Sequence, residues 1–315
     1  MNADYLMTKD RLSVIILTKN GGNLFSEVLN NLFACYGIEK AEVLVIDSGS
    51  VDRTIEYARL HPKIRLIEIP SFDFGHGKTR NLGARLATGE ILLYLVQDAT
   101  PATPNFLRDL IEPLIDPQVA AVYGRQLPRA ATTPLERFFL NATYPESRQV
   151  RAYTGSGRMN IRAIFFSNVC SAIRRSIWEQ FPFDEALIMS EDQQWAKEVL
   201  KAGHHIVYEP KAAVYHSHNY GLKSVFQRNF DSGTCLRGLV DDSIAHMAGY
   251  ELKHLGAGMK ELALGGDLLW IPDFLLCEAA RSLGFFLGQK SHLLPTQVKR
   301  AFSLHKYYWG QPSNK

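Results

Sequence analysis

The chain has 315 residues, of which 46% are hydrophobic and 21% charged, and a formal net charge of +3. A chain of this length can bury a substantial core, in one large domain or two modest ones. The weak positive charge and the lack of a dense Lys/Arg run argue against a nucleic-acid-binding protein.

The cysteines and the N-terminus indicate where the protein works. The four cysteines are scattered, with no CxxC pair, which predicts reduced thiols and argues against a disulfide framework or a zinc site. The first residues, MNADYLMTKDRLSVIILTKN, do not read as a signal peptide, because acidic residues and Lys9 interrupt them. No apolar run reaches about 18 residues, so we expect no membrane-spanning helix and a cytoplasmic protein.

The first hundred residues alternate between predicted strands and helices. The stretch LSVIILTKNGG (12–22) is an apolar strand closed by a turn, and 24–37 has apolar residues at helical spacing. The theme continues with a strand, turn and helix over 41–62, a short strand at 64–70, a helix at 76–89 capped by Gly89, and an apolar strand at 91–96. This alternation predicts an α/β fold with a mostly parallel, doubly wound sheet.

Past residue 105 the pattern loosens. We expect a strand at 119–128, a long polar and aromatic loop region at 128–162, a strand and helix at 164–181, a helix at 190–205 and an extended piece at 206–221. From about residue 222 the pattern is helical. The sequence therefore predicts an α/β domain over residues 1–221 and a helical C-terminal region over residues 222–315.

Three acidic residues and a histidine stand where these elements begin or end. Asp47 closes EVLVID, Asp98 follows ILLYLVQ, Asp192 starts a helix and His216 follows AAVY. Because the carboxyl ends of strands in an open α/β sheet converge on one crevice, we expect these side chains to share a cleft. The sequence lacks GxGxxG, GxxxxGK[ST] and GxSxG motifs, which argues against a dinucleotide-binding dehydrogenase, a P-loop NTPase and an α/β hydrolase.

Five ordered motifs resemble family-two glycosyltransferases of the GT-A fold: VIILTKN, VLVIDSGSVDRT, FGHGKTRNLGARLATGEILLYLVQDATP, SEDQQWAKEVLKAG and VYHSHNYG. Within that group, FDFGHGKTRN, QDATP, YGRQ and HSHNY look like the bacterial rhamnosyltransferases. The resemblance covers roughly residues 11–221. It implies a metal-dependent, inverting enzyme that moves L-rhamnose from dTDP-L-rhamnose to a saccharide hydroxyl during cell-surface polysaccharide biosynthesis.

The resemblance also implies roles for residues of the donor site. Asp47 would bind the pyrimidine ring of the nucleotide; alternatively, it caps an Asx turn. Lys78 and Arg80 would face the donor, where Arg80 could clamp diphosphate oxygens, although solvated helix charges are the alternative. Asp98 would hold Mg²⁺ or Mn²⁺ on the diphosphate. Here the pattern Gln97-Asp98-Ala99 keeps only one acid of the pair that the family often has, so Asp98 as a simple turn residue is the alternative.

His216 is expected to complete the metal site, and His218 is the alternative ligand because HSH places two imidazoles on one face of an extended strand. A mixed Asp/His site favours Mn²⁺ over Mg²⁺. By resemblance, Asp192 is the base that accepts the proton of the acceptor hydroxyl, with Glu191 beside it. The alternative for Asp192 is a favourable interaction with the helix dipole.

Further residues are expected to line the acceptor site or the sugar pocket: Glu191, Arg125, His76 and Asn168. The tail is rich in Leu, Phe and Trp but is broken by charges and Pro272. It either packs on the domain or forms an interfacial patch at the inner face of the cell membrane, in which Lys299, Arg300 and Lys306 interleave with the aromatic residues Phe302, Tyr307, Tyr308 and Trp309. A lipid-linked glycan acceptor would suit such a patch.

Three alternative functions stay open. The same chemistry could use another donor, such as a UDP-hexose. A nucleotidyltransferase would need a Gly-rich, Lys-containing loop after the first strand, which TKNGGNLF supplies poorly. A non-catalytic membrane-docking scaffold is suggested by the single acid of Gln97-Asp98-Ala99 and disfavoured by the intact Glu191-Asp192 pair.

Overall fold

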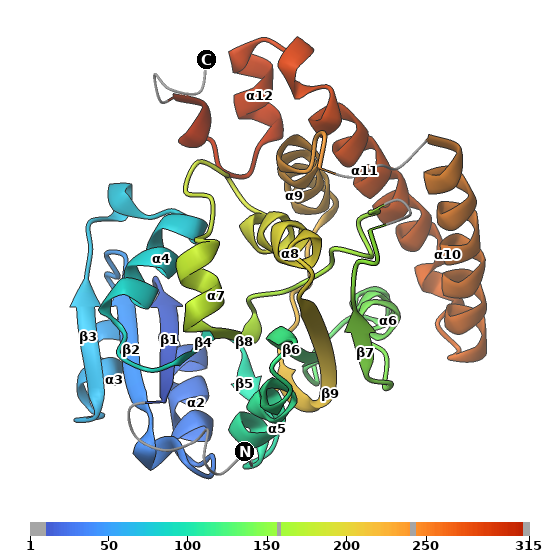
Figure 1. Cartoon of the computed structure of the whole chain (residues 1–315). Helices are drawn as coiled ribbons and strands as arrows, with labels where there is room; N and C mark the ends of the chain where they lie inside the picture. The colour runs from blue at the N-terminus through green and yellow to red at the C-terminus, as the bar shows by residue number, and fades with distance from the viewer. Residues whose placement is uncertain (1–10, 156–158, 240–243, 311–315) are drawn as a thin grey trace.

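The computed structural model describes residues 11–155, 159–239 and 244–310 (Figure 1). One mixed sheet lies at its centre, with strand order β3-β2-β1-β4-β8-β6-β9-β5 and β7 paired to β9 beside this path. The strands are β1 (Leu12–Thr18), β2 (Glu42–Asp47), β3 (Ile64–Glu68), β4 (Ile91–Val96), β5 (Thr100–Pro101), β6 (Val119–Leu127), β7 (Gln149–Arg151), β8 (Cys170–Arg174) and β9 (His205–Tyr215). The helices are α2 (Gly22–Phe33), α3 (Thr54–Arg59), α4 (His76–Leu86), α5 (Phe106–Ile111), α6 (Pro134–Thr143), α7 (Arg175–Gln180), α8 (Glu191–Lys201), α9 (Leu222–Cys235), α10 (Ile244–Leu264), α11 (Ile271–Gln289) and α12 (Thr296–Phe302).

The α/β fold is confirmed, and its sheet has two halves. Strands β1 to β4 are all parallel, and β1, β2 and β4 are almost continuously buried because helices cover both faces of this half. Strand β8 runs antiparallel to both β4 and β6, which makes the sheet mixed. Because β6 is antiparallel to β8 and parallel to β9, both β6 and β9 run in the same direction as β4, so β9 ends at the same edge of the sheet as β4.

Two apolar cores lie on the two faces of the sheet. On one face, α2 and α5 pack through residues such as Phe25, Leu29 and Phe106. On the other face, α7 and α8 pack through Trp178 and Trp195. All four cysteines are free and buried. The helices pack on the two faces of the sheet, and the loops that follow the carboxyl ends of β1, β2 and β4 carry the predicted site residues.

Two local predictions are wrong. Residues 128–162 are not one long loop, because they contain α6 and β7; Thr133 caps α6 by accepting a hydrogen bond from the Glu136 amide, and Pro134 starts the helix. Gly89 does not cap α4, which ends at Leu86. Glycine is required at 89 for another reason: a Cβ there would lie 2.7 Å from the backbone nitrogen of Ser13. Close approach to β1, and not helix termination, explains this glycine.

The C-terminal helices pack against one another and against α6. Helices α9 and α11 lie side by side, and α10 flanks α11 at the edge of the molecule (Figure 1). Their close approach depends on Gly233, Gly284 and Gly288, where a Cβ would collide with backbone atoms of the facing helix. Phe138 of α6 packs edge-on against Phe274 of α11. The C-terminal region is therefore fixed to the sheet domain.

Candidate functional site

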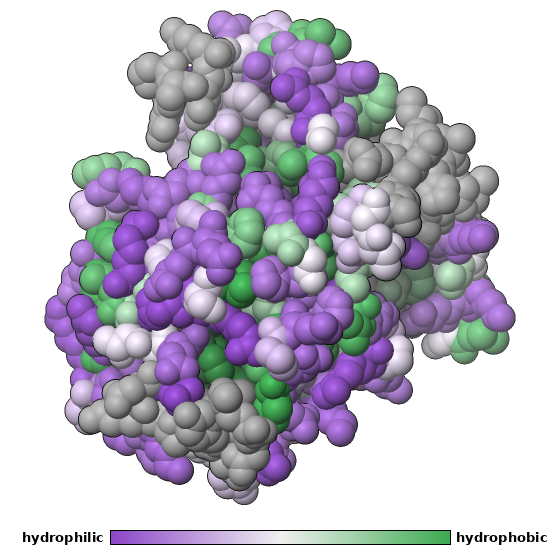
Figure 2. Space-filling view, viewed as in Figure 1, coloured by the Kyte–Doolittle hydropathy of each residue, from purple (hydrophilic) through white to green (hydrophobic). Residues whose placement is uncertain are grey.

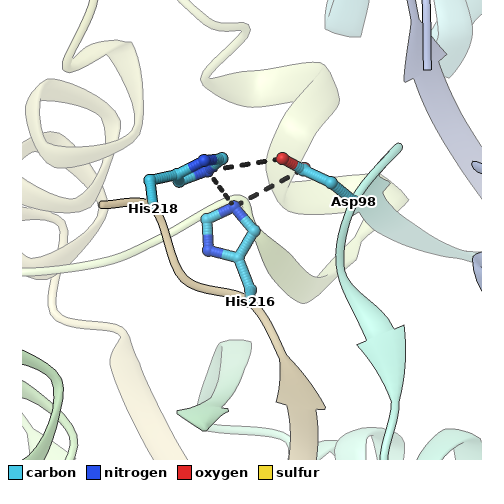
Figure 3. A group of neighbouring side chains, drawn as sticks. All are labelled: Asp98, His216 and His218. Atoms are coloured by element: carbon cyan, nitrogen blue, oxygen red, sulfur yellow. Dashed lines mark hydrogen bonds and ion pairs between the residues drawn. The ribbon is translucent and has the colours of Figure 1, made fainter. Parts of the chain in front are cut away.

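Asp98, His216 and His218 form one cluster (Figure 3). The Nε2 atom of His216 lies 3.5 Å from Asp98 Oδ1, and that of His218 lies 3.3 Å from Asp98 Oδ2. The two Nε2 atoms are 3.0 Å apart. The short strand β5 explains this meeting, because Thr100 pairs with Tyr215 in antiparallel register and so brings the end of β4 beside the end of β9.

The donor set of this cluster suits a divalent transition-metal ion. One carboxylate oxygen and two imidazole nitrogens lie within 4.8 Å of one another. Mixed nitrogen and oxygen ligands suit Mn²⁺ better than Mg²⁺. Burial, assisted by His216, lowers the pKa of His218 to about 4, so its imidazole is neutral at physiological pH and its lone pair can bind a metal. Burial alone would raise the pKa of Asp98, but the neighbouring His216 and His218 hold that pKa below its usual value.

Gln126 orients His216 and was not singled out from the sequence. Its Oε1 lies 2.8 Å from His216 Nδ1, and its Nε2 donates to the hydroxyls of Tyr144 and Ser167. Since a carboxamide oxygen only accepts, the proton of His216 stays on Nδ1 and the Nε2 lone pair faces Asp98. The YGRQ motif contains this residue, but only the pairing of β6 with β9 shows which group it contacts.

A short chain of contacts connects the cluster to Asp192. Ser167, which contacts Gln126, is followed by Asn168, whose backbone amide donates to Asp192 Oδ2 at 3.2 Å. Asn168 is buried; its Oδ1 accepts from Ser171, and its Nδ2 has no hydrogen-bond partner among the described residues. An orphaned buried donor of this kind is available to a ligand. Asp98, His216, Asn168 and Asp192 are thus parts of one connected site.

Asp192 has the electrostatics of a base that works near neutral pH. It occupies the first turn of α8, and its Oδ1 accepts from the Gln193 amide. Burial and the negative charge of Glu191, opposed by Arg80 and by the backbone hydrogen bonds, together raise the pKa of Asp192 to about 7. The residue just before this helix, Ser190, has a left-handed backbone (φ 62°) and makes no side-chain cap. A strained backbone beside a carboxylate with a perturbed pKa is typical of functional sites.

Arg80 and Glu191 form a buried ion pair between α4 and α8. Their side chains are 8% and 4% exposed, so the pair locks the two helices together beside Asp192. His76, at the start of α4, has a pKa lowered to about 4, chiefly by burial. Its ring meets that of His305 edge-on at 5.7 Å, so the C-terminal segment reaches this side of the site.

Asp47 lies at the same edge of the sheet but is fully engaged in a turn. Its side chain has no exposed surface, its Oδ1 accepts from the Gly49 and Ser50 amides, and its Oδ2 accepts from the Ser50 hydroxyl. This geometry favours the Asx-turn alternative. Strand β1 separates β2 from β4, so two strand spacings of about 4.8 Å each place the ends of these strands about 10 Å apart, a span that a nucleoside diphosphate can bridge.

Gln97 explains the missing acid before Asp98. Its Oε1 accepts from the Thr18 hydroxyl at 2.8 Å and from the Lys19 amide at 2.7 Å, and its Nε2 donates to the Lys19 carbonyl. A carboxamide can make all three bonds, whereas a carboxylate could not donate the last. Gln97 therefore ties the end of β4 to the end of β1.

Two predicted residues are not brought to the cluster by any contact among the described residues. Lys78 is exposed and pairs with Asp73 at 3.0 Å. Arg125 lies 3.4 Å from the exposed carboxylate of Glu146. Surface pairs of this kind contribute little to stability and leave both cations able to rearrange.

Comparison with known proteins shows the family of the chain. Residues 13–181 match glycosyl transferase family 2. The chain is similar to O-antigen chain rhamnosyltransferase RfbN of Salmonella typhimurium, with 34% identity over 95% of this chain and 96% of that protein. It is also similar to O-antigen chain rhamnosyltransferase WbaN of Salmonella anatum, with 31% identity over 94% of this chain and 95% of that protein.

Solved structures support the fold. The mannosyltransferase PcManGT of Pyrobaculum calidifontis, in complex with GDP-Man and Mn²⁺, superposes with a TM-score of 0.59 at 20% identity, over 96% of this chain and 88% of that one. TarS of S. aureus, in complex with UDP-GlcNAc, gives a TM-score of 0.53 at 16% identity, over 90% and 91% of the two chains. The expected GT-A type fold is confirmed, and the chain belongs to glycosyl transferase family 2.

Proposed function

We propose that this protein transfers L-rhamnose from dTDP-L-rhamnose to a saccharide hydroxyl during polysaccharide biosynthesis, with inversion at the anomeric carbon. The observation that carries the proposal is the Asp98–His216–His218 cluster, connected through Gln126 and Asn168 to Asp192. Two relatives, each similar to this chain over nearly its whole length, are named rhamnosyltransferases, which supports rhamnose as the transferred sugar.

Asp98, His216 and His218 would hold Mn²⁺, an ion present with the structural neighbour PcManGT. When bound, the ion would neutralise charge on the diphosphate leaving group. Gln126 keeps the His216 lone pair directed at this position. Asp47, Lys78 and Arg80 are the proposed donor contacts; Asp47 would act by shaping the turn that receives the nucleotide, because its carboxylate oxygens are already hydrogen-bonded.

Asp192 is the proposed base. In an inverting transfer, the acceptor oxygen forms a bond to the anomeric carbon while the bond from that carbon to the diphosphate oxygen breaks. The hydroxyl proton passes to the Asp192 carboxylate, and the electron pair leaves with the diphosphate. Glu191, His76, Asn168 and Arg125 are proposed to line the sugar or acceptor side of the same site.

An assay of the purified protein tests this proposal. It compares dTDP-L-rhamnose with UDP-hexoses, each in Mn²⁺ and in EDTA. We expect turnover of dTDP-L-rhamnose with Mn²⁺, loss of turnover in EDTA, and an inverted anomeric product by NMR. Preference for a UDP-hexose would contradict the donor. Pyrophosphate release from a nucleoside triphosphate would indicate a nucleotidyltransferase, and no turnover of any donor would indicate a scaffold.

We also propose that residues 1–221 form the donor-binding and catalytic domain and that residues 222–315 face the acceptor or a membrane. No helix among the described residues is long and apolar enough to cross a bilayer. Contact with a membrane would therefore be peripheral. The predicted aromatic patch is partly wrong, because Trp309 is buried and Phe302 packs beside it.

Other residues support peripheral contact better. Leu269, Leu283, Phe286 and Leu293 are exposed on or next to α11, and Leu269 is 93% exposed. The following segment, 290–310, contains four Lys or Arg residues and no acidic residue. Figure 2 shows hydrophobic side chains at the surface near the junction of α11 and α12, on a face that is otherwise largely hydrophilic.

Exposed leucines beside cations suit the headgroup boundary of an anionic membrane. Flotation with phosphatidylglycerol and phosphatidylcholine vesicles tests this contact. We expect binding to the anionic vesicles only, weakened by Leu283→Ser together with Phe286→Ser. Equal binding of the double variant would contradict membrane contact through this surface.

A further inference from the structure

A cavity of about 560 Å³ lies between α6, α9, α11 and the segment that follows β9. This volume falls within the usual range for small-molecule sites, about 300–1,000 Å³. All four parts contribute polar or aromatic side chains to the wall: Glu136 and Phe139, Tyr220, Arg228, and Asp273 with Arg281. No role described above requires this cavity.

The cavity adjoins the predicted reaction centre on two sides. The ring of Tyr220 stacks on that of His218, with 5.0 Å between ring centroids, and the Arg228 guanidinium lies 4.7 Å above the Tyr220 ring. A continuous stack therefore leads from the metal cluster into the cavity. On the other side, Gln193 lines the cavity and directly follows Asp192. The buried Oε1 of Gln193 has no hydrogen-bond donor among the described residues.

The lining has the chemistry of a carbohydrate site. Trp270 offers an aromatic ring against which the C–H face of a sugar can pack, and Phe139 and Tyr220 add apolar surface to the lining. Glu136 and Asp273 can accept hydrogen bonds from hydroxyl groups, and arginine guanidinium groups can donate to them. The two acids balance Arg228 and Arg281, so the lining favours an uncharged ligand over a phosphate or a nucleotide.

Contacts with aromatic rings hold both arginines in place and leave N–H groups available to a ligand. Arg281 lies 4.1 Å above the Phe139 ring and 3.3 Å from Glu278. Arg228 makes its cation–π contact with Tyr220 and forms no ion pair with a described carboxylate. Stacking fixes the plane of a guanidinium while leaving its N–H groups free to bind a ligand.

We propose that this cavity binds the uncharged saccharide end of the acceptor and delivers its hydroxyl to Asp192. The inference rests on the proposed glycosyl transfer and deepens it. The walls from α9 and α11 would read the sugar that receives rhamnose, whereas the metal cluster and the sheet edge would hold the donor. Specificity for the acceptor would then reside in the C-terminal helices and α6.

The test uses the full chain, radiolabelled dTDP-L-rhamnose and Mn²⁺. The acceptor probe is the glycolipid extract of cells that lack this protein and therefore accumulate its unreacted acceptor. Variants Arg228→Met, Asp273→Asn and Ser232→Phe remove two polar contacts and fill part of the cavity. Arg108→Ala, an exposed residue of α5 outside the cavity and outside the proposed membrane surface, is the matched control.

We expect each cavity variant to raise the acceptor KM by about tenfold, as loss of a hydrogen bond to the acceptor or of space for it would require. Transfer of rhamnose to water without acceptor, which reports only on the donor site, should stay within about twofold of the unaltered chain. Asp273 is exposed, so D273N tests the proposal even if the larger replacement fails to fold.

Unchanged acceptor KM in folded R228M and D273N would overturn the cavity assignment while leaving the proposed function intact. An equal loss of transfer to water and to acceptor would also overturn it, because the cavity would then serve the donor. If the unaltered chain consumes no rhamnosyl donor, the proposed function fails, and the acceptor assignment fails with it.

Discussion

The variant Asp192→Asn tests two consequences of the raised pKa of Asp192: its role as a base in catalysis and its cost to the stability of the fold. The folded protein holds the pKa of Asp192 at about 7, mainly through burial. A free aspartate in the unfolded chain has a pKa of about 3.9. The difference of about 3 units corresponds to about 4 kcal/mol, at about 1.36 kcal/mol per unit.

The sign follows from proton binding. Between about pH 4 and about pH 7, the folded state keeps the Asp192 proton that the unfolded state releases, so stability falls as the pH rises through this window. Activity should change in the opposite direction, because only the deprotonated carboxylate can act as a base. The same burial therefore costs stability at the pH where it supports catalysis.

Asp192→Asn should lower rhamnosyl transfer by about 10²–10⁴-fold. Relative to the unaltered chain, its free energy of unfolding should improve by about 4 kcal/mol on going from about pH 4 to about pH 8. Urea unfolding at the two pH values and kcat/KM profiles from about pH 5.5 to about pH 8.5 measure both effects. Full activity of D192N, or a flat kcat/KM profile for the unaltered chain around pH 7, would refute the reasoning.

Three further predictions concern the metal cluster and the ion pair beside it. His216→Ala and His218→Ala should each weaken Mn²⁺ binding, measured by electron paramagnetic resonance without donor; undiminished affinity in both would remove the cluster as a metal site. Gln126→Leu should weaken Mn²⁺ binding by about 10–100-fold, less than loss of either histidine, and Gln126→Glu, which still accepts from Nδ1–H, should retain more affinity; equal binding by Q126L would show that the contact does not orient His216. Arg80→Met should destabilise the fold by about 3–5 kcal/mol, because it leaves Glu191 buried and unpaired, whereas Arg80→Met with Glu191→Met should cost less; an additive double variant in urea unfolding would contradict the pairing.

The sequence alone predicted the α/β fold, because apolar strands, turn residues and helical spacing are local signals. It also predicted that Asp98, Asp192 and His216, which stand where elements begin or end, share one cleft at an edge of the sheet. Such local signals do not predict a helix or strand whose formation depends on tertiary contacts. Residues 134–143 are polar and aromatic in pattern, and they are helical because a Thr133 cap and packing against the C-terminal helices stabilise α6.

Only the tertiary structure decided how the site is put together. The antiparallel pairing of β5 with β9 places both His216 and His218 beside Asp98, and no sequence spacing encodes this pairing. The same is true of Gln126, which contacts a residue 90 positions away. A sequence pattern reports what each segment prefers, whereas the site depends on which segments pack together, and long-range packing fixes that.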